Sequence, residues 1–318
     1  MDRYSRQSAL HGIGKKGQEK IRKAAVAVIG IGALGTIASD LLARAGIGKL
    51  ILVDRDIVEL SNLQRQTLFD EKDVGSYKAE VAASILKDVN SDVEIEFHVS
   101  DLNHRNTQIL EDASIILDCT DNIYTRHIIN EFCKKSKKPW IYSAAIKEEG
   151  NVITFLPKGA CFGCIFQASK AEETCETAGI LNTASASVAS LAVTQVLKII
   201  LGKTRENELL RFNIWENTLE KIKIKKNPKC KACKGIYEYL SGKKEEKAVK
   251  YCGNNVYQFY LDIDYKKTKE KLKKIAPIKD AGFCFVFNEL TAFRDGRVLV
   301  KEASPERAKA FISRYFGN

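Results

Sequence analysis

Apolar and amphipathic stretches alternate along the first part of the chain. Residues 23–32 form a continuous apolar run that ends in glycines, which is typical of a strand buried on both faces of a parallel sheet. Residues 33–48 then repeat apolar side chains at helical spacing. The same signals predict strands over residues 49–56, 93–99 and 114–121, and helices over residues 76–89 and 123–136. This order predicts an α/β fold with a doubly wound, mainly parallel sheet and a ligand at the carboxyl ends of its strands.

The pattern changes after Trp140. Residues 140–164 alternate in short pieces and residues 209–226 are typical of a hairpin, so we expect an antiparallel extension of the sheet. Residues 187–201 are strongly apolar but contain Gln195 and Lys198, which favours a helix packed inside the domain over a membrane span.

A second unit is predicted at the end of the chain. We expect a large domain over residues 1–240, a lysine-rich linker over residues 241–250, and a small α+β domain over residues 251–318. The predicted order of the small domain is β-α-β-β-α. Its strands are expected over residues 256–263, 282–288 and 296–303, and its helices over residues 264–276 and 304–316.

Composition narrows the class of protein. The 318 residues carry a net charge of +11, concentrated between Lys221 and Lys250, which fits a nucleic acid, an acidic protein partner or a solvated linker. The N-terminus has no apolar core of a signal peptide, so the nine cysteines are expected to be reduced thiols in a cytoplasmic protein. We therefore look among the cysteines for metal binding or thiol chemistry.

A glycine-rich turn follows the first predicted strand. Gly30, Gly32 and Gly35 allow a tight turn and close backbone approach, and the helix that begins there offers free N–H groups to a phosphate. Asp54 ends the next strand, where a carboxylate can accept both ribose hydroxyls. This motif predicts a nucleotide site, a Rossmann-like feature, without separating ATP from NAD. An NAD-dependent oxidoreductase is therefore the alternative.

Charged residues after the strands favour a triphosphate. Arg65 and Lys78 follow the second strand, and Asp121 follows residues 114–120 with an oxygen ligand suited to Mg²⁺. Two cations, a magnesium carboxylate and a ribose carboxylate are what ATP requires. The four histidines stand in no recognisable catalytic setting.

Two cysteine pairs predict a zinc site. Cys161 and Cys164 form one C-x-x-C knuckle, and Cys230 and Cys233 form another. This spacing is typical of a tetrahedral Cys₄ site, which leaves no open position and is therefore structural.

Five motifs occur in order within residues 1–235: RYSRQ, GxGALG, VDRDxVExSNLQRQ, VGxxKAE and DCTDN. Together they resemble the ThiF/MoeB/HesA family of adenylyltransferases, which are related to ubiquitin-activating enzymes. The resemblance implies that Gly32 contacts the nucleotide, Asp54 the ribose, and Asp121 the magnesium. The phosphate contacts that it implies are Asn62, Arg65 and Lys78. Further residues of these motifs are expected to line the nucleotide site: Asp56, Gln66 and Asn122.

The activity implied is attack by the C-terminal Gly-Gly carboxylate of a small ubiquitin-fold sulfur carrier on the α-phosphorus of ATP. Pyrophosphate leaves, and the product serves thiamine, molybdopterin or tRNA-thiolation sulfur transfer. A carboxyl group of pKa near 3.5 is already ionised at pH 7, so no general base is needed. The resemblance also implies a homodimer in which Arg6 reaches the γ-phosphate of the neighbouring subunit. A sulfurtransferase or cysteine desulfurase is a further possible partner, and we expect neither a membrane nor a specific nucleic acid.

The remaining cysteines divide into two groups. Cys119, Cys133 and Cys284 lie in apolar patterns and are predicted core residues. Cys175 matches the position that the family uses for a thioester or persulfide, while Cys252 is either a sulfur acceptor or a plain linker residue. The small C-terminal domain is expected either to dock the carrier or to stabilise the large domain.

Overall fold

The computed structural model describes residues 3–166, 179–204, 208–244, 249–251, 256–261, 263–280, 282, 284–294 and 296–316. The chain divides into two compact units, residues 1–244 and 245–318, each with a sheet and a core of its own. Cys175 and Cys252 lie outside the described residues.

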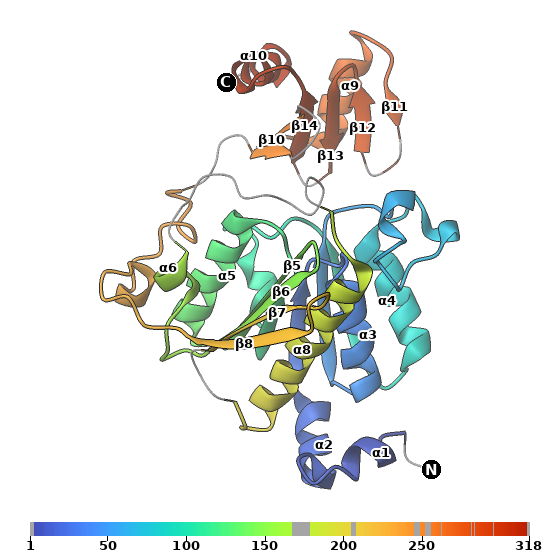
Figure 1. Ribbon diagram of the computed structural model, residues 1–318. Helices are drawn as coiled ribbons and strands as arrows, with labels where there is room; N and C mark the ends of the chain where they lie inside the picture. Colours follow the sequence, from blue (N-terminus) through green and yellow to red (C-terminus); the bar gives the residue numbers. More distant parts are fainter. Residues whose placement is uncertain are drawn as a thin grey trace. The chain divides into compact units, whose positions relative to one another are not determined.

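An eight-stranded sheet forms the first unit (Figure 1). Its spatial order is β3-β2-β1-β4-β5-β6-β7-β8. The first five strands in this order, β3, β2, β1, β4 and β5, are parallel to one another, and β6, β7 and β8 continue the sheet in antiparallel pairs. The strands are β1 (Ala25–Ile29), β2 (Lys49–Asp54), β3 (Glu94–Val99), β4 (Ile115–Asp118), β5 (Trp140–Ile146), β6 (Glu149–Phe155), β7 (Glu208–Asn213) and β8 (Thr218–Lys223). The predicted doubly wound sheet with an antiparallel extension is confirmed.

Helices cover both faces of this sheet. Successive side chains of a strand point to opposite faces, so Val26 and Val28 enter one core cluster with α3, α4 and α8, while Ala27 and Ile29 enter another with α5 and α6. Short 3₁₀ turns occupy Leu60–Asn62, Glu71–Asp73, Thr107–Leu110 and Ala232–Lys234. The helices are α1 (Ser5–Ser8), α2 (Gly14–Lys23), α3 (Gly35–Ala45), α4 (Lys78–Val89), α5 (Ile123–Ser136), α6 (Phe162–Ile165) and α8 (Asn182–Ile200).

Helix α8 is long and apolar enough to cross a membrane by length and composition alone. Its residues Val188, Ala192 and Val196 are buried in the same core cluster as the strands, as expected of a helix packed on a sheet in a globular domain. The predicted packing of this apolar segment inside the domain is confirmed.

The second unit has an antiparallel sheet of order β11-β12-β13-β14-β10-β9. Alternate residues of its inner strands, such as Phe285 and Val298, pack with Leu272 of α9 and Ile312 of α10 in one core. Both helices therefore cover the same face of the sheet. The elements are β9 (Val249–Tyr251), β10 (Val256–Tyr260), α9 (Tyr265–Lys273), β11 (Lys279–Asp280), β12 (Cys284–Phe287), β13 (Leu290–Phe293), β14 (Arg297–Lys301) and α10 (Pro305–Phe316).

The predicted order β-α-β-β-α missed three strands of this unit, β9, β11 and β13. β12 and β13 are joined through Asn288 and Glu289, and Asn288 has a φ of 51°. An asparagine of positive φ is typical of a tight hairpin turn, which the sequence pattern did not separate from the strand before it.

Candidate functional site

The glycine turn lies between β1 and α3. Gly30 has a φ of 87°, and a Cβ there would lie 2.8 Å from the carbonyl oxygen of Cys119. A Cβ on Gly35 would lie only 1.9 Å from the carbonyl oxygen of Gly30. These two glycines therefore let the turn pack closely against the helix and the neighbouring strand. Gly32 differs, because the nearest atom to a Cβ there is Nε2 of Gln66 at 3.8 Å.

Asp54, the last residue of β2, ties this turn to the next loop. Its Oδ2 accepts a hydrogen bond from the Ile31 amide at 2.6 Å, and its Oδ1 accepts one from the Asp56 amide at 2.7 Å. Burial, and then the charge of Asp56, raise the pKa of the Asp54 carboxyl to about 6, against the opposing effect of Lys78. Asp54 is therefore a buried carboxylate that is largely ionised at pH 7.

The loop after β2 positions Lys78 at the start of α4. Its backbone pairs with residues just before that helix: the Val58 amide donates to Ser76 O at 2.8 Å, and the Lys78 amide donates to Asp56 O at 3.0 Å. Lys78 is buried, and its Nζ lies 3.7 Å from Oδ2 of Asp56. The structure thus brings the predicted residues Asp54, Asp56 and Lys78 together.

The predicted phosphate contacts of the following turn have different surroundings. Asn62 is buried and its Oδ1 accepts from the Glu59 amide at 3.3 Å, whereas Arg65 is partly exposed and donates to Ser61 O at 3.0 Å. Gln66 is buried, yet its Oε1 has no hydrogen-bond partner among the described residues. A buried acceptor left unpaired costs about 1 to 3 kcal/mol, so Oε1 of Gln66 is a candidate to accept a hydrogen bond from a ligand.

The loop after β4 lies next to the glycine turn, because Ile29 and Asp118 are partners in the β1–β4 ladder. Asp121 is exposed in this loop. Asn122 caps α5, since its Oδ1 accepts a hydrogen bond from the Thr125 amide at 3.1 Å. Asp121 therefore stands at the carboxyl edge of the parallel strands, where a ligand of this fold is expected.

Sequence reasoning missed a buried network beneath this loop. Nε of Arg126 lies 3.2 Å from Oδ2 of Asp118, and its Nη2 donates to the carbonyl oxygens of Thr120 and Ser143. Burial raises the pKa of Asp118, although Arg126 opposes this. The only local signal is an arginine within a mainly apolar helix pattern. Its partners lie six, eight and seventeen residues away, and no local pattern connects them.

Arg6 lies away from these residues within one chain. Its helix α1 is held at the far end of α3, where Gln7 donates to Ala45 O at 2.9 Å. Gln18 of α2 donates to the same oxygen, also at 2.9 Å. Because α3 has 11 residues, it separates the two ends by about 16 Å. The structure does not bring Arg6 together with the glycine turn of its own chain.

The four predicted cysteine ligands converge. All their sulfur atoms lie within 4.8 Å of one another. Individual separations are 3.8 Å between Cys161 and Cys164, 3.5 Å between Cys161 and Cys230, and 3.6 Å between Cys164 and Cys233. Zinc–sulfur bonds of about 2.3 Å in a tetrahedron place sulfurs about 3.8 Å apart, so this cluster fits Zn²⁺ in size and ligand type.

Helix α5 holds the polypeptide around the cluster. Asn130 accepts from the Phe162 amide at 2.9 Å, and Oε2 of Glu131 accepts from the Tyr239 and Leu240 amides at 2.9 and 2.8 Å. The ring of His127 stacks on Tyr239 with centroids 4.2 Å apart. Burial, and then the charge of Lys244, lower the pKa of His127 to about 4, so this ring is neutral at pH 7.

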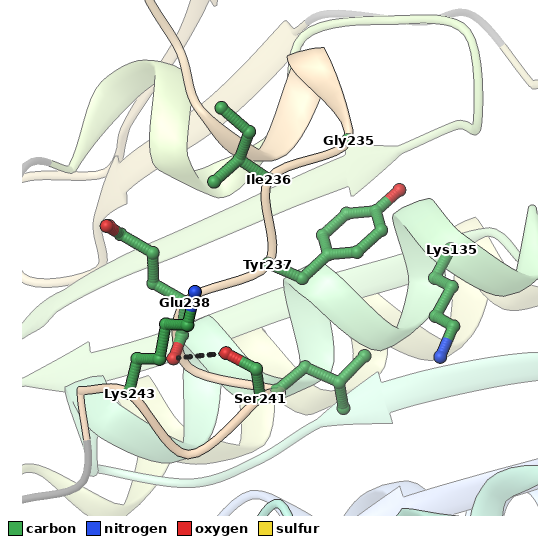
Figure 2. Close-up of a pocket in the computed structure, with 8 residues that line it drawn as sticks. Lys135, Gly235, Ile236, Tyr237, Glu238, Ser241 and Lys243 are labelled. Atoms are coloured by element: carbon green, nitrogen blue, oxygen red, sulfur yellow. Dashed lines mark hydrogen bonds between the residues drawn. The ribbon is translucent and has the colours of Figure 1, made fainter.

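A hollow of about 430 Å³ opens beside the segment that follows the cluster (Figure 2). Lys135 of α5 lines it together with residues of segment 235–243, in which Ser241 donates to Glu238 O at 3.2 Å. Lys135 is near the C-terminal end of α5, whereas Asn122 caps its N-terminal end, and this 14-residue helix is about 21 Å long. Lys135 is therefore far from Asp121 along α5, whereas Tyr239, which adjoins the lining residues, contacts Tyr124 near the start of that helix.

The three cysteines predicted to belong to the core, Cys119, Cys133 and Cys284, are buried, as expected. Burial raises the pKa of each thiol. A buried neutral thiol behaves as a small apolar side chain, which agrees with a packing role.

Comparisons with known proteins agree with this geometry. The chain is 35% identical to the sulfur carrier protein ThiS adenylyltransferase of Bacillus subtilis, over 99% of both chains. It is 34% identical to the SAMP-activating enzyme E1 of Haloferax volcanii, over 73% of this chain and 88% of that one. A crystal structure of MccB from E. coli with ATP superposes with a TM-score of 0.65 at 25% identity, covering 73% of each chain. Residues 4–232 match the model of the ThiF family, and the chain belongs to that family.

Proposed function

We propose that this protein uses ATP to adenylate the C-terminal carboxylate of a small ubiquitin-fold sulfur carrier that ends in Gly-Gly. The observation that carries the proposal is the length of the match to the Bacillus subtilis ThiS adenylyltransferase, which extends through both units of the chain. The Haloferax volcanii relative matches 73% of the chain. The longer match favours a ThiS-like carrier as the substrate, and therefore a role in the thiamine branch of sulfur transfer.

The nucleotide would lie against the glycine turn. Gly32 leaves room beside Gln66, whose unpaired Oε1 can accept a hydrogen bond from the ligand. Each oxygen of Asp54 already accepts one hydrogen bond from a backbone amide. An ionised carboxylate has further lone pairs, which can accept hydrogen bonds from the ribose hydroxyls. The start of α3 offers backbone N–H groups to phosphate oxygens.

The phosphates would be neutralised from the adjoining loops. Lys78 and Arg65 supply positive charge, Asn62 an amide, and Asp121 a carboxylate oxygen for Mg²⁺. Magnesium when bound would neutralise charge that develops on the departing pyrophosphate. In the reaction a carboxylate oxygen of the carrier forms a bond to the α-phosphorus while the bond from that phosphorus to the pyrophosphate oxygen breaks. No proton is transferred, because the attacking carboxylate is already ionised at pH 7.

Assembly of two chains would complete the site. Arg6 is exposed on α1 at the end of α3 opposite the glycine turn. Its proposed contact with a γ-phosphate therefore requires a second copy of the chain, so the proposal includes a homodimer. Cys175 remains a proposed site for a later thioester or persulfide, with a sulfurtransferase or cysteine desulfurase as sulfur donor.

The cysteine cluster would hold Zn²⁺ through Cys161, Cys164, Cys230 and Cys233. Four thiolates leave no open coordination position, so the ion would join the segment after β8 to the knuckle at α6 and take no part in the reaction. Folding of the segment around Tyr239 onto α5 would depend on it.

ATP–pyrophosphate exchange tests the proposal. Radiolabelled pyrophosphate should enter ATP only when the chain, Mg²⁺ and a carrier that ends in Gly-Gly are all present. A carrier lacking its last glycine is the matched control, and Asp121→Ala should abolish exchange while leaving the protein folded. Exchange that is absent with every Gly-Gly carrier tested, or a rise in melting temperature with NAD and none with ATP, would contradict the proposal.

A further inference from the structure

Helix α5 buries an unusual run of polar side chains. Arg126, His127, Asn130 and Glu131 are each no more than 6% exposed. Charged side chains are rarely buried this far unless they are paired. Arg126 stands out because it is the one of these four that contacts the loop carrying Asp121 through both its charge and its hydrogen bonds.

The guanidinium of Arg126 joins the end of β4 and the loop after it to β5. Its Nε lies 3.2 Å from Oδ2 of Asp118 in β4, and its Nη2 donates to the carbonyl oxygen of Thr120 just after that strand. The same Nη2 donates to Ser143 O in β5 at 3.3 Å. Its Cζ lies 4.6 Å from the centre of the Tyr142 ring, so the guanidinium is also held over an aromatic face.

The same loop is fixed from its other side. Oδ1 of Asp118 accepts from the Thr120 amide at 2.9 Å and from Thr120 Oγ1 at 2.7 Å. Asn122 is held as the cap of α5. Asp121 is thus the one residue between two anchored neighbours, and its charge is among those that raise the pKa of Arg126. The backbone of Asp121 is therefore held between these two anchored neighbours, and its side chain is exposed at the edge of the sheet.

We propose that Arg126 is a positioning residue for the divalent cation: it holds the loop after β4 in the conformation that aims Asp121 at the nucleotide. This inference rests on the proposed function, in which Asp121 binds Mg²⁺. Replacing a buried ion pair by apolar residues is often neutral for stability, so stability alone gives little reason to keep one here. The planar fork of arginine, which reaches two carbonyl oxygens and a carboxylate at once, supplies that reason.

A double-mutant cycle tests the inference. Arg126→Lys keeps the charge and loses the fork, Asp121→Asn removes the proposed magnesium ligand, and the double variant combines them. For each protein, calorimetric titration measures ATP affinity with and without Mg²⁺, and the ratio of the two affinities reports the cation. We expect Arg126→Lys to lower this ratio about tenfold, equal to about 1.4 kcal/mol. In the Asp121→Asn background the same change should have no further effect.

Two further variants keep the test decisive. Thr120→Val removes the bond from Thr120 Oγ1 to Asp118 and leaves the buried ion pair intact, so it loosens the loop even if Arg126→Lys fails to fold. It should lower the ratio in the same direction. Arg211→Lys is the matched control, because Arg211 is an exposed residue of β7 that pairs with Glu149 at 3.1 Å, and its replacement should change nothing.

The outcomes separate the inference from the proposed function. Losses from Arg126→Lys and Asp121→Asn that simply add would make Arg126 a structural residue and overturn the inference. An unchanged ratio in both Arg126→Lys and Thr120→Val would do the same. A wild-type protein that binds ATP equally with and without Mg²⁺, or does not bind it, would instead overturn the proposed function.

Discussion

Two aspartates buried at strand ends should respond in opposite ways to the same substitution. Asp54 ends β2 and Asp118 ends β4, and both are at most 9% exposed. Asp118 is paired with Arg126, whereas the groups that bind Asp54 through hydrogen bonds are backbone amides. Replacing each aspartate by asparagine therefore distinguishes a carboxylate that stabilises the fold from one that serves ligand binding.

The magnitude follows from the pKa of Asp54, which is raised from 3.8 to about 6. Each pH unit corresponds to about 1.4 kcal/mol, so keeping this group ionised in the folded protein costs about 3 kcal/mol. Asp54→Asn removes that cost. However, the NH₂ group of the asparagine takes the place of one carboxylate oxygen and cannot accept a hydrogen bond. The Ile31 or Asp56 amide that donated to that oxygen is left unpaired, which costs about 1 to 3 kcal/mol. At pH 7.5 the variant should therefore be as stable as the wild type, or more stable by up to about 2 kcal/mol.

The dependence on pH has a definite sign. A folded-state pKa raised above the unfolded value gives stability that is present at low pH and is lost as the pH rises through about 6. Between pH 5 and pH 7.5 the wild type should lose about 1.4 kcal/mol through Asp54, and the variant should not. Urea unfolding followed by tryptophan fluorescence measures this, because both tryptophans, Trp140 and Trp215, belong to the first unit.

The matched control is Asp118→Asn, which leaves the buried guanidinium of Arg126 without its counter-charge. We expect a loss of about 3 to 5 kcal/mol for that variant at pH 7.5. ATP affinity of Asp54→Asn should fall at least about tenfold, since a charged acceptor for the ribose is lost. A loss of several kcal/mol by Asp54→Asn at pH 7.5, or a stability difference that does not change with pH, would refute this reasoning.

Three other predictions follow from the same geometry. Gly35→Ala should cost about 3 kcal/mol of stability in urea unfolding, because the new Cβ would lie 1.9 Å from the backbone oxygen of Gly30; a variant of normal stability would contradict the packing. Metal analysis should find one zinc per chain, and Cys230→Ser should lose it and lower the melting temperature; a metal-free protein of equal stability would remove the zinc site. Inactive Arg6→Ala and Asp121→Ala proteins, mixed and reassembled, should regain about a quarter of wild-type exchange if sites are shared between subunits; no recovery in mixed dimers would leave Arg6 without that role.

Regular elements could be predicted from the sequence because their signals are local. Residues 123–136 were predicted as a helix and form α5 with the same bounds, since a capping asparagine and helical spacing mark its start. The pairing of Cys161 with Cys230, 69 residues apart, was also predictable, because two C-x-x-C knuckles have few other uses in a reduced chain.

Long-range polar contacts could not be predicted in this way. The partners of Arg126 come from β4 and β5, and only the parallel pairing of these strands brings Asp118 and Ser143 to one point. The orphan acceptor of Gln66 is likewise a property of packing, although the residue itself was singled out by its motif. Local spacing therefore identifies candidate residues, while their partners depend on the folded sheet.

The most direct test of the account is the mass of a Gly-Gly carrier protein after incubation with this chain, ATP and Mg²⁺. The account predicts a carrier that gains one adenylate at its C-terminal carboxylate, with release of one pyrophosphate, and no gain for a carrier that lacks the last glycine. A carrier of unchanged mass under conditions where the chain demonstrably binds both ATP and the carrier would contradict it.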